Sequence, residues 1–314
     1  MASSINRKST YAFLGPVGTF TELALAQVKA ANNAKSIPVA TVTEAIDAVL
    51  TGKAVRAIVP VENSIEGGVS ATLDALANTE DIRIYGEYLV PVTFNLVAKP
   101  GTKLADVKVV STHPTAYAQC RKYLAANLPK HTHLPATSTA AAAAALLDSK
   151  STADAAIAAK SITDHYKLTV LAKNIGDNKN AQTRFIEIGL PAKPTARTGK
   201  DKTSVIVELP EDRPGALLEM LEQFAARGVN LSRIESRPVG DQLGRYRFNI
   251  DVQGHIDDEA VAEALKGLHR FSPKVIFLGS YPRADKQKSD HQGNNSNKDF
   301  SSADNWLNKL RAGR

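Results

Sequence analysis

The chain has 314 residues, of which 43% are hydrophobic and 23% charged, a composition ordinary for a globular protein of about two domains. No apolar run reaches the roughly 18 residues of a membrane span, and the N-terminus lacks the apolar stretch of a secretory signal. Cys120 is the only cysteine, which excludes an intrachain disulfide and a thiolate zinc cluster. The composition therefore predicts a cytoplasmic protein with no bound metal and no membrane anchor.

The net charge of +7 comes mainly from two segments without hydrophobic periodicity. Residues 191–202 carry four basic and one acidic side chain, and residues 283–314 carry seven basic and four acidic ones, so together they supply six of the seven excess charges. A nucleic-acid surface would instead gather basic and aromatic residues on a folded element. No nucleic-acid partner is therefore expected.

Residues 10–190 repeat a short apolar strand, a polar loop and a helix. Strands are expected at residues 11–14, 57–61, 107–111 and 155–158. The alanine run 140–145 follows Ser138, so it is predicted to be a capped helix. Strands that alternate with helices indicate βαβ units and a mostly parallel sheet, whose carboxyl edge binds ligands.

The first two polar loops carry candidate binding residues. Thr19 and Glu22 have capping-box spacing, so a helix is expected to start at Thr19, where free N–H groups favour an anion. Glu62, Asn63 and Ser64 follow an apolar strand; the amide and the hydroxyl can donate hydrogen bonds and the carboxylate can accept them. An ordinary cap and an ordinary turn are the alternatives, but several such loops at equivalent strand ends predict a cleft for a dicarboxylate.

The third polar loop, around Thr112 and His113, is predicted to start a helix, because proline is favoured in the first turn. Gln119 lies seven residues after Thr112, about two turns along the same helix face. His113 is interpreted either as an acid or base or as a structural residue. Cys120 is predicted to be a buried, small apolar residue.

Thr183, Arg184 and Phe185 stand near the start of a predicted strand. Alternation places Thr183 and Phe185 on one side and Arg184 on the other. A threonine hydroxyl is a poor acid, but it can donate a strong hydrogen bond to a leaving hydroxyl group. Arg184 can pair with a substrate or with a structural carboxylate, and its opposite orientation favours the structural role.

After the proline-containing linker 191–202, residues 203–282 form a separate module. Alternating apolar residues and two helical patterns predict the order β-α-β-β-α-β of a ferredoxin-like fold, with one sheet face left free for pairing with another copy. The helix that starts within residues 212–218 has N–H groups that can hold a carboxylate, and Asn230 with residues 235–238 can hold an amino group. A plain helix start and an edge strand are the alternative interpretation. The tail 283–314 is predicted to be disordered, with a short helix at 303–311.

Six ordered motifs resemble those of prephenate dehydratases. Residues 15–20, 60–64, 113–114 with 119–120, and 183–185 are similar to the motifs of the catalytic domain, and residues 215–218 and 234–238 to the phenylalanine-binding motifs of the ACT domain. The family's serine before His-Pro is Thr112 here. The resemblance implies a catalytic domain at 10–190 with two α/β lobes like type II periplasmic binding proteins, and a βαββαβ ACT domain at 203–282. The chain is expected to cross twice between the lobes, near residues 87–93 and 170–182.

The resemblance also implies a monofunctional enzyme that decarboxylates and dehydrates prephenate to phenylpyruvate without a cofactor, a step toward L-phenylalanine, which inhibits it. Thr183 is the implied catalytic residue. The implied substrate-binding residues are Thr19, Glu62, Asn63, Ser64, Thr112, His113, Gln119, Arg184 and Phe185. The residues implied to bind L-phenylalanine are Gly215, Ala216, Leu217, Asn230, Leu231, Glu235, Ser236, Arg237 and Pro238. The family resemblance implies a homo-oligomer, a dimer or a tetramer, formed through the ACT and catalytic domains.

Two alternatives stay open. Arogenate dehydratase catalyses the same reaction on the amino analogue, and the sequence does not separate the two substrates. A non-enzymatic amino-acid sensor could also combine a binding cleft with an ACT module. Thr183 beside an ordered set of polar loops argues against the sensor.

Overall fold

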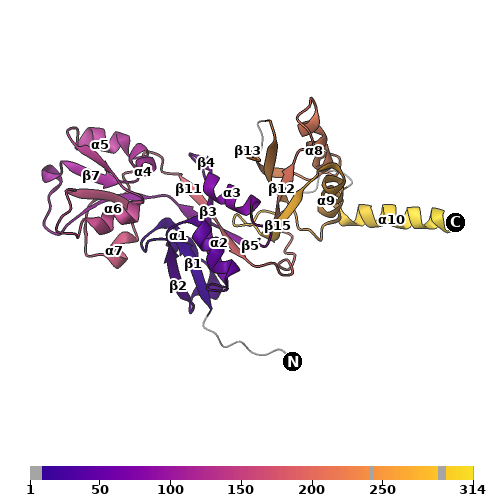
Figure 1. Ribbon diagram of the computed structural model, residues 1–314, viewed down its shortest axis with the longest axis horizontal. Coiled ribbons are helices and arrows are strands. Elements are labelled where there is room, and N and C mark those ends of the chain that lie inside the picture. Colours follow the sequence, from indigo (N-terminus) through magenta and orange to yellow (C-terminus); the bar gives the residue numbers. More distant parts are fainter. Residues whose placement is uncertain (1–8, 241–243, 289–294, 314) are drawn as a thin grey trace. The chain divides into compact units, whose positions relative to one another are not determined.

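The computed structural model describes residues 9–240, 244–288 and 295–313. The chain forms two compact units (Figure 1). The first unit contains Met1–Val69 and Tyr88–Phe185, and the second contains Ser70–Glu87 and Ile186–Arg314. None of the helices in the described part of the chain is long and apolar enough to cross a membrane.

The first sheet has the strand order β2-β1-β3-β11-β5, with β4 paired to β3. Its strands are β1 (Thr10–Leu14), β2 (Lys35–Val39), β3 (Arg56–Asn63), β4 (Gly67–Gly68), β5 (Arg83–Pro91) and β11 (Gln182–Gly189). Strand β1 runs parallel to β2 and β3, as the βαβ pattern predicts. Tyr11 and Phe13 alternate into a core with Ile58 and Phe185. Helices α1 (Phe20–Leu25) and α2 (Val42–Leu50) are capped by Thr19 and Thr41.

The second sheet has the order β10-β6-β9-β7-β8. Its strands are β6 (Phe94–Ala98), β7 (Val109–Thr112), β8 (Thr132–Pro135), β9 (Ala155–Ala159) and β10 (Thr169–Ala172), and its helices are α4 (Pro114–Ala118), α5 (Arg121–Asn127), α6 (Thr139–Ala145) and α7 (Ile162–His165). The Ser138 side chain caps α6, which confirms the predicted helix. The chain passes between the sheets after β5 and again after β10, within the two ranges that the sequence predicts. The two-lobed α/β architecture is therefore confirmed.

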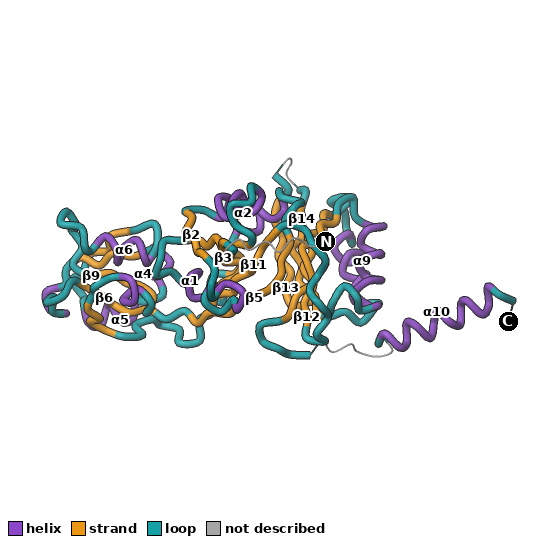
Figure 2. The backbone as a smooth tube through the Cα atoms, turned by 90° about the horizontal axis from the view of Figure 1, so that it is seen from below, coloured by secondary structure: helices purple, strands orange, loops and turns teal. Residues whose placement is uncertain are grey.

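The second unit contains a four-stranded antiparallel sheet in the order β13-β14-β12-β15. The chain order is β12 (Asp201–Glu208), α8 (Ala216–Ala225), β13 (Leu231–Pro238), β14 (Tyr246–Gln253), α9 (Glu259–Phe271) and β15 (Val275–Pro282), which confirms the ferredoxin-like βαββαβ fold. Both helices pack on one face of the sheet, around Met220, Phe224 and Leu268 (Figure 2). Because the sequence resemblance implies a regulatory role for this fold, we call these strands and helices the regulatory module.

The opposite face of this sheet is not left free, contrary to the prediction from sequence. Helix α3 (Ser70–Ala77) and the start of β5 lie on it. Arg247 of β14 points away from the helices, and its guanidinium donates to Asp74 of α3 at 3.0 Å. Lys202 of β12 donates to Glu87 of β5 at 2.8 Å. The sequence did not reveal this packing because α3 belongs to the catalytic domain in the resemblance.

Part of the C-terminal tail forms helix α10 (Asn297–Arg311), which starts six residues earlier than the predicted short helix. Ser296 and Asp299 form a capping box that accounts for the earlier start. Phe300 of α10 packs against the core of the regulatory module.

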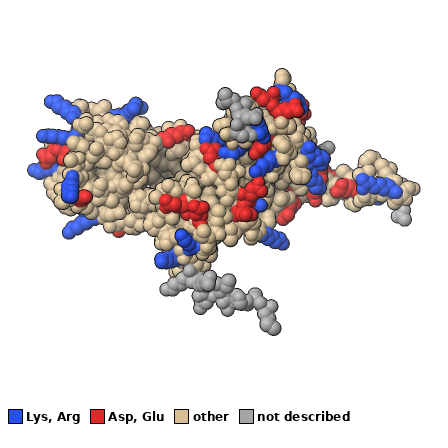
Figure 3. All heavy atoms as spheres, viewed as in Figure 1, with Lys and Arg blue, Asp and Glu red and all other residues tan. Residues whose placement is uncertain are grey.

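Acidic and basic side chains are interspersed on the face of the molecule seen in Figure 3.

Candidate functional site

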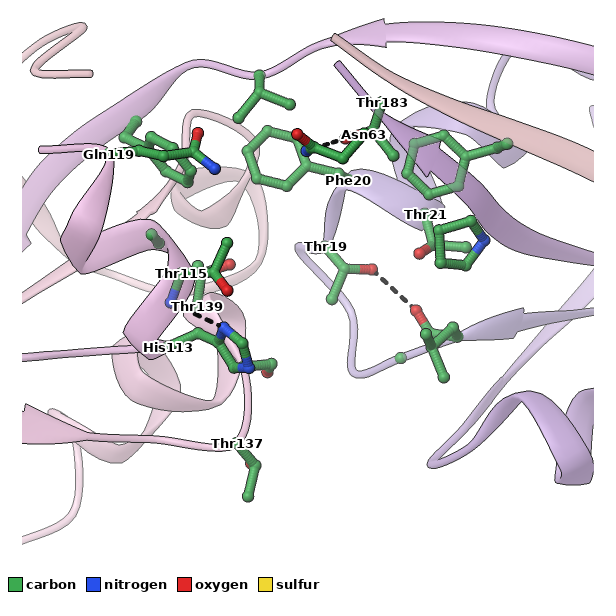
Figure 4. A pocket seen from close by; sticks show the side chains of 18 residues that line it. Thr19, Phe20, Thr21, Asn63, His113, Thr115, Gln119, Thr137, Thr139 and Thr183 are labelled. Atoms are coloured by element: carbon green, nitrogen blue, oxygen red, sulfur yellow. Dashed lines mark hydrogen bonds between the residues drawn. The ribbon is translucent and has the colours of Figure 1, made fainter. Parts of the chain in front are cut away.

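A pocket of about 230 Å³ lies in the first unit and is lined from both of its sheets. Thr19, Asn63 and Thr183 face His113, Thr115 and Gln119 across it (Figure 4). The remaining lining residues are Leu14, Gly15, Phe20, Thr21, Pro60, Val92, Phe94, Ala116, Thr137, Ser138, Thr139 and Phe185. None of these described lining residues is Asp, Glu, Lys or Arg, so polar contacts to a ligand come from neutral groups and His113.

The hydroxyl of Thr183 is held by Asn63. The Asn63 amide nitrogen donates to Thr183 Oγ1 at 3.0 Å, and its amide oxygen accepts from the backbone N–H of Ile65 at 2.9 Å. Because the oxygen is committed to a backbone donor, the amide group has to present its NH₂ to Thr183. The Thr183 oxygen therefore accepts from Asn63, and its own proton is left to donate into the pocket.

Ser64 acts on the same site from the outside of the pocket. Its hydroxyl accepts from Gln182 N–H at 3.0 Å, and its own N–H donates to the Gln182 carbonyl at 2.9 Å. These two bonds fasten the turn after β3 to β11, one residue before Thr183. Ser64 thus lies beside the site but does not line the pocket.

Arg184 and Glu62 are also outside the lining. Arg184 is buried, and its guanidinium is 3.3 Å from the Glu62 carboxylate. Thr183 and Phe185 line the pocket while Arg184 does not, which matches the predicted strand alternation. The structure therefore brings Glu62 and Arg184 to each other instead of to the pocket.

Thr19 lies at the pocket as the N-cap of α1. Its hydroxyl accepts from Glu22 N–H at 3.4 Å and donates to the Leu14 carbonyl at 3.2 Å. The Glu22 carboxylate accepts from Gly18 N–H at 2.6 Å, so the capping pattern predicted from sequence is present with Gly18 as the donor. Phe20 follows Thr19 and packs edge-on against Phe94 of the second sheet, with ring centroids 5.6 Å apart.

His113 caps α4 with its ring. Its Nδ1 accepts from Thr115 N–H at 3.3 Å, so in the neutral ring the proton is on Nε2. At the other end of α4, Gln119 lines the pocket and donates to Glu66 Oε1 at 3.3 Å. His113 and Gln119 therefore border the pocket from the two ends of one short helix.

Thr112 does not share a face with Gln119, contrary to the predicted spacing. The helix begins only at Pro114, and Thr112 is the last residue of β7. Its buried hydroxyl donates to the Ile157 carbonyl at 2.9 Å. Cys120 is fully buried, as predicted, and burial raises the pKa of its thiol to about 12.

Sequence reasoning missed several hydroxyl residues of the pocket, namely Thr21, Thr115, Thr137 and Thr139. Thr137 and Thr139 flank Ser138, the N-cap of α6, and follow the end of β8. The sequence signalled the cap but not its position at the pocket. Strand β8 runs parallel to β7, so the residues that follow both strands lie at the same edge of the sheet. That shared edge is the signal that could have found Thr137 and Thr139.

The candidate residues of the regulatory module fall into two groups. Gly215, at φ 84°, precedes α8, and Ala216 and Leu217 form its first turn. On β13, Ile234 and Ser236 pair with core-facing Ile250 and Phe248, whereas Glu235 and Arg237 pair with Asn249 and Arg247 on the opposite face.

The module residues nearest to β13 are partly accessible. Asn230 is exposed just before the strand, and Leu231 packs against the core. Leu217, Leu218, Ile234 and Tyr246 are exposed apolar residues, and β13 is an edge strand of the sheet. The structure thus does not bring all nine predicted ligand residues to one place.

The fold and the pocket define a two-lobed α/β enzyme with a ferredoxin-like regulatory module. A family model of prephenate dehydratase matches residues 11–193, and one of the ACT domain matches residues 203–270. A curated prephenate dehydratase of Mycobacterium marinum is 44% identical over 279 residues, which cover 86% of this chain and 88% of the relative. The chain therefore belongs to the prephenate dehydratase family of decarboxylating hydro-lyases.

One solved structure agrees with this assignment, and a second is described with another activity. The crystal structure of prephenate dehydratase from Arthrobacter aurescens in complex with L-Phe is 53% identical, with a TM-score of 0.92, and the match covers 96% of this chain and 99% of that one. A second neighbour, GqqA, is described as a novel type of quorum quenching acylase. It is 30% identical, with a TM-score of 0.76, and the match covers 87% of this chain and 97% of that one.

Proposed function

We propose that this enzyme converts prephenate to phenylpyruvate, carbon dioxide and water, on the route to L-phenylalanine. The observation that carries the proposal is the Thr183 hydroxyl, which Asn63 orients so that its proton donates into the pocket. In the reaction, the bond from the ring to its carboxylate breaks and its electron pair moves into the ring. The ring becomes aromatic as the C–O bond at the opposite carbon breaks and hydroxide leaves. A hydrogen bond from Thr183 to that oxygen stabilises the departing charge, an effect typically worth about 10²–10⁴ in rate.

The neutral lining suits this chemistry. Prephenate carries two carboxylates, and one of them has to be lost as carbon dioxide. A guanidinium or ammonium group at that carboxylate would stabilise the charged ground state, whereas catalysis requires stronger binding of the transition state. Hydroxyl and amide donors such as Thr115, Thr139 and Gln119 can orient the substrate with a weaker preference for the ground state.

The lining also favours prephenate over arogenate. Arogenate carries an ammonium group where prephenate has a ketone, and a buried ammonium group needs a carboxylate or several acceptors. No Asp or Glu is among the described residues that line the pocket. We therefore expect a higher kcat/KM for prephenate.

The pocket gives little support for the acylase activity described for GqqA. Hydrolysis of an acyl amide usually needs a nucleophile that is hydrogen-bonded to a general base. His113 is the titratable residue of the lining, and its Nδ1 accepts from a backbone N–H. Among the described residues no side-chain hydroxyl donates to this ring, so an activated nucleophile is missing.

For regulation, we propose that L-phenylalanine binds to the regulatory module where two copies pair along β13, and that it inhibits turnover. The N–H groups of Leu217 and Leu218, in the first turn of α8, would hold its carboxylate, because the Ala216 N–H already donates to the Arg213 carbonyl. The exposed apolar residues Leu217, Leu218 and Ile234 would surround its ring. The solved relative in complex with L-Phe supports this ligand. A cytoplasmic homotetramer, built through both kinds of unit, is the assembly we propose.

The test is a steady-state assay of purified enzyme with prephenate and with arogenate, each with and without L-phenylalanine. We expect turnover of prephenate with the higher kcat/KM and its suppression by L-phenylalanine. Turnover of arogenate alone would replace the proposed substrate. Calorimetric binding of an amino acid without turnover of either compound would favour the sensor, and release of an acyl group from an amide in a parallel assay would favour the acylase.

A further inference from the structure

A segment of the family's catalytic domain belongs structurally to the second unit. Residues 70–87 lie within the matched range 11–193, yet they cluster with Ile186–Arg314. They are fastened to the regulatory module by the side chains of Asp74, Asn78, Glu80 and Glu87. The backbones also approach closely, because a Cβ atom on Gly279 of β15 would lie 2.4 Å from the Ile84 carbonyl oxygen. We call residues 70–87 the bridging segment.

Asp74 makes the most extensive of these contacts. Arg237 donates two hydrogen bonds to its carboxylate, from Nε at 3.2 Å and from Nη2 at 2.6 Å. Arg247, which is buried, donates a third bond to the Asp74 carboxylate from Nη2 at 3.0 Å. Its Nη1 donates to the Asn78 side chain at 3.4 Å. Bidentate pairs between arginine and a carboxylate have a defined geometry as well as a favourable energy, so the Asp74 contacts help to set the position of α3 on the sheet.

The direction of Arg237 separates it from the rest of its motif. Arg237 lies on the face of β13 that carries Arg247, while Ser236 lies on the face that packs against the helices. The start of α8, whose first-turn N–H groups are the proposed carboxylate donors, lies on the helix face. The Arg237 guanidinium is therefore engaged with the bridging segment, on the other side of the sheet from the proposed ligand.

The bridging segment is joined through the chain to the parts of the pocket that carry its chemistry. Asn63 precedes Ser70 by seven residues, and Val92 and Phe94 follow Glu87 by five and seven residues. The other connection is shorter, because the chain enters the second unit at Ile186, directly after Thr183, Arg184 and Phe185. A change in the regulatory module can thus reach both Asn63 and Thr183 along the backbone.

We propose that Asp74 is the coupling residue between the regulatory module and the pocket, and that Arg237 acts on Asp74 rather than on L-phenylalanine. The proposal rests on the proposed function, because it concerns how inhibition is transmitted. Binding of the ligand at β13 shifts the position of Arg237, the Asp74 pair carries the shift to α3, and the turn that holds Asn63 moves with it. Misplacement of Asn63 turns the Thr183 hydroxyl away from the departing oxygen.

The test separates ligand binding from inhibition in the full-length enzyme. Asp74→Asn removes the charge with little change in size, and Asp81→Asn makes the same change in the bridging segment at an exposed residue for which the described structure shows no side-chain partner. Allosteric coupling is typically about 5–150-fold. At saturating L-phenylalanine we expect the wild type and Asp81→Asn to be inhibited within this range, and Asp74→Asn by less than about twofold relative to its own uninhibited rate. Calorimetry should show that Asp74→Asn still binds L-phenylalanine.

A second variant distinguishes loss of coupling from a folding defect. Arg237→Gln should also bind L-phenylalanine and escape inhibition, and both variants should show the far-UV spectrum of the wild type. Full inhibition of Asp74→Asn would overturn the proposal, as would loss of L-phenylalanine binding in Arg237→Gln. If the wild type itself turns over prephenate but ignores L-phenylalanine, the regulatory part of the proposed function fails instead.

Discussion

The two units of this enzyme use polar side chains in opposite ways. The pocket of the first unit is lined by neutral donors and one histidine, whereas the bridging segment of the second unit is held by ion pairs such as Asp74 with Arg237 and Glu87 with Lys202. In the proposed reaction, neutral groups would let the pocket direct a proton toward the leaving oxygen without trapping a carboxylate. Ion pairs fix the relative position of two packed elements through geometry. Changes in the pocket should therefore act on the chemical step, and changes in the second unit on its control.

The largest effect should come from Thr183. Thr183→Ala removes the proton that Asn63 directs into the pocket, so we expect kcat for prephenate to fall by about 10²-fold or more. Thr183→Ser keeps the hydroxyl and should retain most of the activity. A wild-type kcat in Thr183→Ala would contradict the proposed role of the hydroxyl, and circular dichroism would show whether the fold is preserved.

The next effect should come from Asn63, which tests orientation rather than presence of the hydroxyl. Asn63→Asp still accepts from Ile65 N–H, but it can no longer donate to Thr183. The threonine proton then turns toward the new carboxylate, so we expect kcat to fall about 10–100-fold.

Two further variants make the Asn63 result interpretable. Asn63→Leu removes the donor without adding charge, which separates the loss of orientation from repulsion of an anionic substrate. Asn32→Asp adds the same charge at an exposed position of the first unit and should leave both kcat and KM unchanged. An Asn63→Asp enzyme that changes only KM would indicate a role in binding alone.

A smaller effect is expected at Gly215, in the second unit. Its φ of 84° is unfavourable for a residue with a side chain, although no atom lies within 4 Å of the added Cβ. Gly215→Val should therefore distort the start of α8 at a cost of about 1–2 kcal/mol and raise the L-phenylalanine concentration for half inhibition about 10-fold. Uninhibited kcat should stay within about twofold of the wild type.

Gly52 provides the matched control for this prediction. It has a φ of 71°, also with no atom within 4 Å of the added Cβ, but it lies in an exposed turn of the first unit. Gly52→Val carries similar backbone strain and should leave inhibition by L-phenylalanine unchanged. Equal loss of inhibition in both variants would mean that strain anywhere in the chain weakens regulation.

Local patterns in the sequence predicted the elements and part of the pocket. Alternation separates Thr183 and Phe185, which line the pocket, from Arg184, which pairs with Glu62. The same alternation separates Arg237 from Ser236, whereas the motif resemblance groups residues 235–238 together. The predicted spacing puts Thr112 and Gln119 on one helix face, but the helix begins two residues after Thr112, at Pro114.

Contacts between distant segments could not be predicted in this way. Asp74 and Arg237 are 163 residues apart, and neither neighbourhood carries a signal for the other. Asn63 and Thr183 are 120 residues apart, and their hydrogen bond depends on the pairing of β3 with β11. The sequence predicted that both residues belong to the site. Only the structure shows that Asn63 donates the hydrogen bond and that it orients the Thr183 hydroxyl.

The smallest effect concerns Cys120, which lies beside the pocket residue Gln119 but should take no part in catalysis. Burial raises the pKa of its thiol from 9.0 to about 12, so the reactive thiolate is almost absent at neutral pH. We expect a thiol reagent to leave native Cys120 unmodified at pH 8 and to label it fully in denaturant. Because the folded pKa lies above the unfolded one, the contribution of Cys120 to stability should be constant below pH 9.0 and decrease between there and about pH 12 as only the unfolded thiol ionises. Rapid labelling of the native enzyme would mean that α4 and α5 open at the pocket, and Cys120→Ala, which should be fully active, would then show whether the label or the opening affects turnover.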